Sequence, residues 1–181
     1  MRWLGLCVAL AAAVPALPQQ LAVGQLLVAA PNLHDADFEH SVILLIRYDQ
    51  QSAVGLFIHR PSDVPVSEVY PELKSPVTFY VGGPITIGVR ALFRSHGAPS
   101  LAHGLFADVF LITKKPLLTK LIADRTPASV LRVYAGSCGW SAAQLRGEVQ
   151  RGLWRVLPAD AAAVFDPHPE ALWQRLTGAR N

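Results

Sequence analysis

The sequence predicts an α+β fold with a mainly antiparallel sheet. Short apolar runs bounded by Pro, Gly and Asp outnumber the segments with helical periodicity, and the two kinds do not alternate regularly. The length of 181 residues suits one domain, which we expect over residues 21–181. A composition that is 51% hydrophobic and 16% charged excludes intrinsic disorder, and the presence of only two cysteines excludes a disulfide-rich miniprotein.

The expected strands share a short apolar run that ends near a turn-forming residue. They are residues 26–30, 42–48, 54–59, 77–81, 89–93, 105–112 and 130–135. The run at 42–48 (VILLIRY) is almost continuously hydrophobic, so we expect it to be covered on both faces. A polar turn at 49–52 joins it to the next run, which predicts a hairpin.

Two of the three expected helices open with a proline. Pro116 can occupy the first turn of a helix whose apolar stripe comprises Leu117, Leu118, Leu121 and Ile122. Pro169 opens the last helix, and Gly178 is the residue expected to end it.

The third expected helix spans residues 141–157. Ser141 is a good N-cap, and Gln144 three residues later completes a capping box. Apolar residues then recur every four positions, at Leu145, Val149 and Leu153. Pro158 stops the pattern.

Residues 1–16 have the features of a secretory signal peptide. Arg2 precedes an uncharged apolar stretch at 3–14, and Val14 and Ala16 stand at the −3 and −1 positions of a cleavage site after Ala16. A membrane-spanning helix needs about 20 apolar residues, so this stretch is too short to remain as an anchor. We therefore expect a secreted or periplasmic protein. The alternative is a buried N-terminal segment in a cytoplasmic protein.

A series of motifs occurs in order along residues 26–173. They are a strand ending in Pro, a Leu-x-Asp-x-x-Phe-x-x-Ser-Val segment, a Gly and Arg-Pro hairpin arm, a Gly-Gly-Pro, and a Gly-x-x-x-Trp block ending in Glu and Trp. The matching positions are Pro31, Leu33, Asp35, Phe38, Ser41, Val42, Gly55, Arg60, Pro61, Gly82, Gly83, Pro84, Gly136, Trp140, Gln144, Leu145, Glu148 and Trp154, followed by Phe165 and Trp173. On these residues the chain resembles the YqgE/AlgH family of uncharacterised bacterial proteins.

The resemblance implies a bent, partly bifurcated sheet that closes toward a pseudo-barrel, with helices packed outside. It also carries the label of a transcriptional regulator, but it supplies no catalytic residues, cofactor or metal ligands. The chain departs from the family pattern at four positions: His59 replaces Asn, Arg94 replaces His, Ala143 replaces Gly and Arg146 replaces Glu. If the Asn or the His serves a shared function, this member lacks it.

Most motif residues have structural interpretations. Gly82, Gly83 and Pro84 suit a sharp turn at a strand end, and no phosphate-binding pattern follows them. The best candidates for a partner-binding surface are Trp140, Gln144, Glu148 and Trp154, because Gln144 and Glu148 lie one helical turn apart near two tryptophans. The alternative is that both tryptophans fill the core.

Cys138 is the one candidate nucleophile. It lies between an expected strand and an expected helix N-terminus, which would favour a thiolate. A base would have to come from His59, His96 or His103, and the surrounding glycines do not form a nucleophile-elbow pattern. A small buried thiol is therefore the preferred interpretation.

Two further interpretations are weaker still. Residues 34–40 (HDADFEH) hold five potential metal ligands, but a surface turn capped by Asp35 explains them better. Residues 114–181 hold ten basic against five acidic side chains, whereas residues 31–72 hold two basic against seven acidic ones. Basic side chains precede the 141–157 helix at Lys114, Lys115 and Lys120 and lie on it at Arg146, Arg151 and Arg155. The three arginines wrap around the helix and form no single stripe, and no nucleic-acid-binding motif is present.

The sequence thus favours a non-enzymatic binding or regulatory domain without a cofactor, acting on an unknown protein partner or small ligand. The alternatives are a thiol-dependent hydrolase-like enzyme that uses Cys138, and a DNA-linked regulator if the chain stays in the cytoplasm. Nucleic acid is the least favoured partner.

Overall fold

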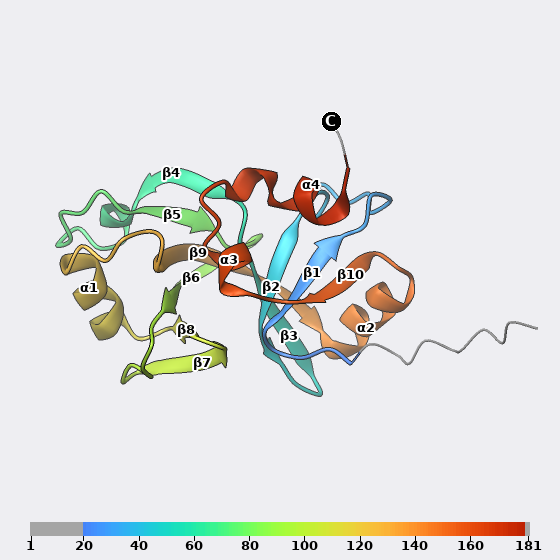
Figure 1. Cartoon of the computed structure of the whole chain (residues 1–181), viewed down its shortest axis with the longest axis horizontal. Helices are drawn as coiled ribbons and strands as arrows, with labels where there is room; N and C mark the ends of the chain where they lie inside the picture. Colours follow the sequence, from blue (N-terminus) through green and yellow to red (C-terminus); the bar gives the residue numbers. More distant parts are fainter. Residues whose placement is uncertain (1–19, 180–181) are drawn as a thin grey trace, which may run out of the picture.

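A computed structural model describes residues 20–179, so the expected signal peptide at 1–16 lies outside the described residues. Within this range ten strands form one curled sheet (Figure 1). The strands are β1 (Gln25–Ala29), β2 (Val42–Tyr48), β3 (Ser52–Phe57), β4 (Pro61–Pro65), β5 (Thr78–Val81), β6 (Ile85–Arg94), β7 (Ala102–Phe106), β8 (Val109–Ile112), β9 (Leu131–Ser141) and β10 (Trp154–Pro158). The helices are η1 (Val66–Glu68), α1 (Lys115–Ala123), α2 (Ala142–Gln150), α3 (Ala161–Val164), η2 (Pro169–Ala171) and α4 (Leu172–Thr177).

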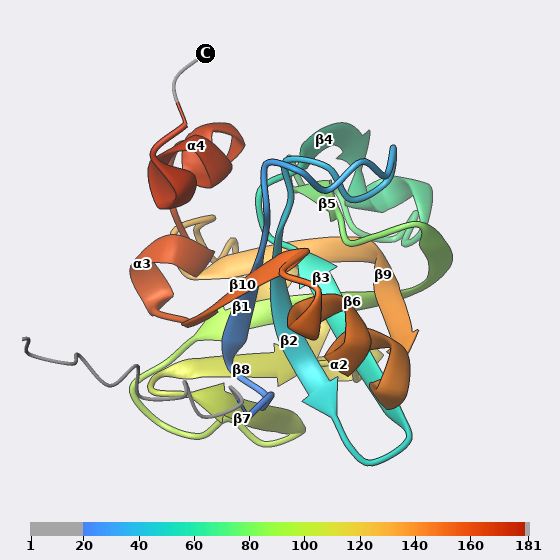
Figure 2. The same ribbon diagram turned by 90° about the vertical axis from the view of Figure 1, so that its right-hand side faces the viewer.

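The expected α+β class with a mainly antiparallel sheet is confirmed. The main path of the sheet runs β10-β1-β2-β3-β9-β6-β8-β7, while β5 lies beside both β4 and β9. Among the described pairs β5–β9 is parallel and the others are antiparallel. Figure 2 shows α2 on one side of the curled sheet and α3 and α4 on another, so the helices pack outside it. No helix of residues 20–179 is long and apolar enough to cross a membrane.

The half of the molecule around β10, β1, β2 and β3, the β2 half, is densely packed. Residues 42–46 of β2 are all buried, as its continuous hydrophobic sequence predicts. Leu44 lies opposite Leu26 of β1 and Leu56 of β3, and all three are at most 2% exposed. The expected hairpin between β2 and β3 is confirmed, with Asp49 accepting hydrogen bonds from the backbone N–H groups of Gln51 and Ser52.

Strand β9 joins this half to the other one. Its first residues pair with β5 and β6, and its last four, Cys138–Ser141, pair with β3. Gly136 has φ +81, and a Cβ on Gly82 would lie 2.3 Å from the Gly136 carbonyl oxygen. A Cβ on Gly83 would lie 2.3 Å from the carbonyl carbon of Ser137. The glycines of the two motifs are therefore needed where two backbones touch.

The half around β4–β8 and α1, the α1 half, differs from the sequence prediction in three places. The strand expected at 89–93 is part of β6, which begins four residues earlier at Ile85. The run at 105–112 is a hairpin and not one strand, because Ala107 takes a positive φ of +43 and turns β7 back along β8. Strand β4 was not expected, since it begins and ends with proline. It pairs with β5 alone, and proline is tolerated on such an edge. Helix α1 begins beside Pro116 as expected.

The expected helix at 141–157 is wrong beyond residue 150. Ser141 does cap α2, since its hydroxyl accepts a 3.1 Å hydrogen bond from the backbone N–H of Gln144. The chain then turns at Gly152, where φ is +73, and Trp154–Pro158 forms edge strand β10 against β1. The last helix, α4, follows the turn opened by Pro169 and ends as expected at Gly178, which has φ +71.

Candidate functional site

The two tryptophans of the expected partner-binding surface lie in the core. Trp140 and Trp154 are 6% and 4% exposed, and their ring centroids lie 6.2 Å apart. The ring of Phe38 packs against both, with its centroid 5.5 Å from that of Trp140 and 5.9 Å from that of Trp154. These rings thus fill the space beneath α2, as large aromatics in a core do.

The polar members of that group form a hydrogen-bonded chain. The side-chain amide of Gln144 donates a 2.9 Å bond to Glu148 Oε1, and the indole N–H of Trp154 donates a 2.8 Å bond to Glu148 Oε2. Gln144 is exposed, while Glu148 is half-buried. The chain ties α2 to β10, and its use as a partner surface stays a prediction.

Cys138 lies within β9 and not at a helix N-terminus, so that expectation is wrong. Its side chain is fully buried, and the thiol donates to the Gly82 carbonyl oxygen at 3.6 Å. Burial raises the pKa of this thiol well above its usual range, because a thiolate would lose its hydration. A thiol held in this way is a poor nucleophile.

His59, one of the three bases considered for Cys138, is also buried in the core. Its Nδ1 lies 3.3 Å from the backbone nitrogen and 3.2 Å from the carbonyl oxygen of Val42. Burial, and next the charge of Arg60, lower the pKa of His59 to about 4. The guanidinium carbon of Arg60 lies 3.9 Å from the centroid of the Phe57 ring, and Arg60 donates a hydrogen bond to the backbone carbonyl of Asp37. Arg60 therefore links the turn at residues 34–40 to β3.

The stretch at 34–40 forms the surface turn that the sequence favoured. The Asp35 carboxylate accepts a 2.9 Å hydrogen bond from the backbone N–H of Asp37, which confirms its capping role. The ring of His40 packs 4.3 Å from that of Trp173. Nowhere in residues 20–179 do three His, Cys, Asp or Glu side chains gather so that they could hold a metal ion.

The three arginines expected on the 141–157 helix are divided between α2 and β10. Arg146 lies on α2 and donates to the hydroxyl of Tyr48, whereas Arg151 caps its C-terminus. Arg155 lies on β10 and donates to the carbonyl of Leu176 in α4. These three residues therefore do not lie together on one helix.

A cavity in the α1 half, which the sequence did not predict, is the best candidate site. This α1 cavity has a volume of about 840 Å³ and lies where the starts of β5 and β9 meet the end of α1 and the segment 72–77. Its apolar wall comprises Leu73, Val77, Ile122, Leu131 and Val133, with the ring of Tyr80 beside them. Its hydroxyl groups come from Ser75, Thr78, Thr126 and Tyr80. Ligand sites commonly have volumes of about 300–1,000 Å³ and this mixture of groups.

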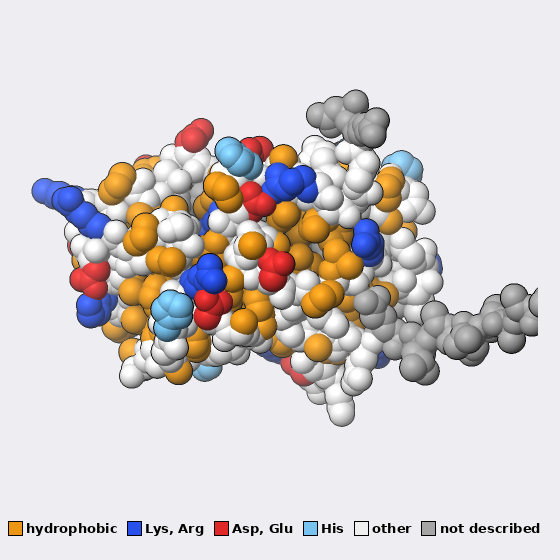
Figure 3. Space-filling view, viewed as in Figure 1, with side chains coloured by type: hydrophobic (Ala, Val, Ile, Leu, Met, Phe, Trp, Pro, Cys, Tyr) orange, Lys and Arg blue, Asp and Glu red, His pale blue; other side chains and the backbone are white. Residues whose placement is uncertain are grey.

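The charged side chains of the α1 cavity are mostly cationic: Lys74, Arg125 and Arg132. Its one carboxylate, Glu72, lies 3.1 Å from the ammonium group of Lys115. Among residues 20–179 no carboxylate forms an ion pair with Lys74, Arg125 or Arg132. Figure 3 shows Lys and Arg side chains projecting from the end of the molecule that carries α1 and the β4–β5 hairpin.

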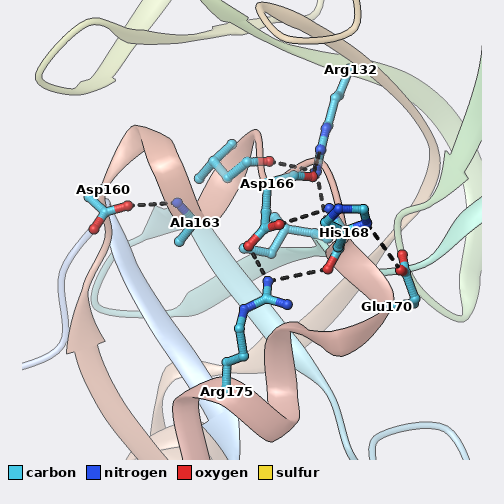
Figure 4. A network of polar contacts seen from close by, with 9 residues as sticks. Arg132, Asp160, Ala163, Asp166, His168, Glu170 and Arg175 are labelled. Atoms are coloured by element: carbon cyan, nitrogen blue, oxygen red, sulfur yellow. Dashed lines mark hydrogen bonds and ion pairs between the residues drawn. The ribbon is translucent and has the colours of Figure 1, made fainter.

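Arg132 brings a buried charge to this site. The residue is 4% exposed, and its guanidinium donates to the carbonyl oxygens of Val164, at 2.8 Å, and Asp166 (Figure 4). It also lies 4.8 Å from the centroid of the Tyr80 ring. The Asp166 carboxylate is used elsewhere, in an ion pair with Arg175. The Nε of Arg132 has no hydrogen-bond partner in the described chain.

The fold is that of a small α+β protein in which a curled, mainly antiparallel sheet carries helices on its outside. A family model described as AlgH-like matches residues 26–179. The chain therefore belongs to the AlgH-like family, as the resemblance implied.

Individual relatives agree with this assignment. A protein from Streptomyces avermitilis, named only as a UPF0301 protein, is 32% identical over 84% of this chain and 83% of its own. A UPF0301 protein from Thermobifida fusca is 34% identical over 84% of both chains. The solution structure of the AlgH protein from Pseudomonas aeruginosa has a TM-score of 0.68 at 30% identity, covering 86% of this chain and 85% of that one. A crystal structure from Corynebacterium diphtheriae has a TM-score of 0.74 at 26% identity, covering 92% and 91%.

Proposed function

We propose that the protein is a non-enzymatic binding or regulatory domain and that the α1 cavity is its ligand site. The observation that carries the proposal is a cavity of about 840 Å³ with an apolar wall, several hydroxyl groups and unpaired cations on one side of a rigid sheet. Such a combination binds a ligand through the apolar wall and orients it through the few polar groups.

A binding role is also supported by the state of the reactive groups. The Cys138 thiol is buried in β9 with its proton held by the Gly82 carbonyl, and His59 bonds the backbone of Val42. Neither side chain lines the α1 cavity. The residues that do line it offer hydrogen bonds, charge and apolar area, which are the means of recognition.

The proposal is tested by finding where small molecules bind. A fragment library screened by amide chemical shifts is expected to give most of its hits on residues 72–78 and 122–133. The variant Ala128→Trp, which places an indole at a lining position, should abolish these hits. Ala143→Trp, at an exposed position on α2, is the matched control and should retain them. Hits that avoid the cavity, or that survive Ala128→Trp, would refute the proposal.

We propose in addition that the protein acts outside the cytoplasm after removal of residues 1–16. The support is the order of Arg2, the apolar stretch and Ala16 in the sequence. Intact-mass measurement on protein recovered from separate cell fractions tests this directly. A chain that begins at Leu17 in an extracytoplasmic fraction is expected, and a cytosolic chain that retains residues 1–16 would exclude export.

A further inference from the structure

We infer that the α1 cavity takes an amphipathic anion, in which a phosphate or carboxylate group is joined to an apolar body. This inference rests on the proposed function and adds the chemical class of the ligand. Nothing in the names of the relatives assigns such a ligand.

The lining of the cavity carries an excess of positive charge. Lys74, Arg125 and Arg132 are cations without a carboxylate partner among residues 20–179, and Glu72 is neutralised by Lys115 at 3.1 Å. Positive charges on the low-dielectric walls of a cleft reinforce one another and concentrate anions there. An anionic group is therefore the complement of this lining, and a cationic one is repelled.

Arg132 adds a buried guanidinium to the residues that line the cavity. It is 4% exposed, its amino groups donate to the backbone carbonyls of Ile58, Val164 and Asp166, and its Nε has no partner in the described chain. A buried charge is costly unless an opposite charge balances it. Within residues 20–179 no side chain supplies that balance, and an anion bound in the adjoining cavity would.

Arg125 has a backbone conformation that is unusual for a residue with a side chain. Its φ is +56, immediately after α1, where its N–H bonds the Ile122 carbonyl and the N–H of Thr126 bonds the Leu121 carbonyl. This is the position at which helices most often place glycine, because a side chain is strained there. Arg125 keeps a guanidinium at the rim of the cavity in spite of that strain, which points to a role for the side chain.

The apolar wall distinguishes this site from one for a bare ion. Val77 and Tyr80 are half-buried and Ala123 and Ala128 are exposed, and they line the same cavity as the cations. Inorganic phosphate would leave this wall and the Tyr80 ring in contact with water. A ligand with an aliphatic or aromatic body would cover them, and the burial of that body would strengthen binding.

The experiment compares probes that share one body. Titrations with 1-naphthyl phosphate, 1-naphthoate, 1-naphthol and 1-naphthylmethylamine are followed by calorimetry and by the amide shifts of residues 72–78 and 122–133. At least one anionic probe is expected to bind about tenfold or more tightly than 1-naphthol, and the amine most weakly. The tighter of the two anions then identifies the head group. Inorganic phosphate alone should bind more weakly than 1-naphthyl phosphate.

Charge variants show whether the cavity cations are responsible. Arg125→Gln and Lys74→Gln should each lower the affinity for the preferred anion about three- to tenfold and leave the affinity for 1-naphthol unchanged. Lys120→Gln is the matched control, because Lys120 lies on α1 but outside the lining and pairs with Asp124 at 2.5 Å. It should change neither affinity.

The outcomes separate the two proposals. If 1-naphthol and the amine shift the cavity amides as strongly as the anions do, the ligand class is wrong and the binding site stands. If an anion binds but Lys120→Gln weakens it as much as Arg125→Gln does, general charge attraction explains the binding and the inference fails. If none of the probes shifts the cavity amides, the ligand class is wrong, and the fragment screen decides the proposed function separately.

Discussion

The β2 half and the α1 half of the molecule differ in how completely their side chains fill the interior. In the β2 half, five successive residues of β2 are fully or almost fully buried, and Phe38, Trp140 and Trp154 fill the space beneath α2. In the α1 half, the ends of β5, β9 and α1 leave a cavity of about 840 Å³ beside a buried arginine. A densely packed half gives the rigid support on which an incompletely packed half can serve for binding.

The junction of the two halves should be the most sensitive point of the chain. Gly83→Ala would place a Cβ 2.3 Å from the carbonyl carbon of Ser137, at a φ of +153 that side chains rarely adopt. We expect a loss of more than about 4 kcal/mol in the free energy of unfolding, or failure to fold. Gly97→Ala, whose Cβ would meet nothing within 4 Å, is the control for chemical denaturation. Equal stability of the two variants would show that the halves are not held together by this contact.

Matched leucine truncations measure the difference in packing directly. Leu44→Ala removes a side chain that is 0% exposed in the centre of the β2 half, and should cost about 3 kcal/mol. Leu73→Ala removes one that is 9% exposed and already borders the α1 cavity, so about 1–2 kcal/mol is expected. Denaturant titration of both variants gives the comparison. A larger loss for Leu73→Ala would mean that the α1 half is as well packed as the other.

The acid sensitivity of the fold should originate in the β2 half. Burial lowers the pKa of His59 from the ordinary 6.5 to about 4, so the unfolded chain takes up a proton before the folded one does. The contribution of His59 to the free energy of unfolding is fully present above about pH 6.5. It falls by up to about 3 kcal/mol as the pH decreases toward 4.

The test of this contribution is unfolding measured between pH 7 and pH 4. His59→Asn, which removes the imidazole and keeps a polar side chain, should flatten the pH dependence between these values. His34→Asn, at an exposed turn position, controls for the loss of a histidine as such. An unchanged slope in His59→Asn would place the acid-sensitive group elsewhere.

The same division into halves explains what the sequence could predict. The β2 half is made of local patterns: VILLI marks a strand buried on both faces, and Ser141 with Gln144 marks a helix start. The helix at 141–157 was extended too far because the leucine spacing continues, although Trp154 and Val156 are buried and Arg155 is exposed, which is the alternation of a strand. The two-residue alternation of such a short strand is masked in the sequence by the four-residue spacing of the apolar residues before it.

The candidate site could not be predicted from the sequence, because its residues come from segments that are separated along the chain. Lys74, Arg125 and Arg132 come from a loop, a helix end and a strand, and only the parallel pairing of β5 with β9 brings those segments together. The motif residues gave no indication either, since Gly82, Gly83 and Gly136 serve a backbone contact and Asp35 serves a turn. A charged residue inside an apolar strand, Arg132 between Leu131 and Val133, was the one available signal.

The smallest expected effect links stability with binding in the α1 half. Arg125→Gly relieves a side chain held at φ +56 after α1, and should raise the free energy of unfolding by about 0.5–1 kcal/mol. Arg125→Ala keeps a Cβ in the same conformation and should leave stability nearly unchanged. Both variants lose the guanidinium, so both should bind the anionic probe more weakly and to the same extent. Calorimetry measures these affinities. If Arg125→Gly instead destabilises the protein, the arginine is held there by packing, and the backbone strain would no longer support a role in binding.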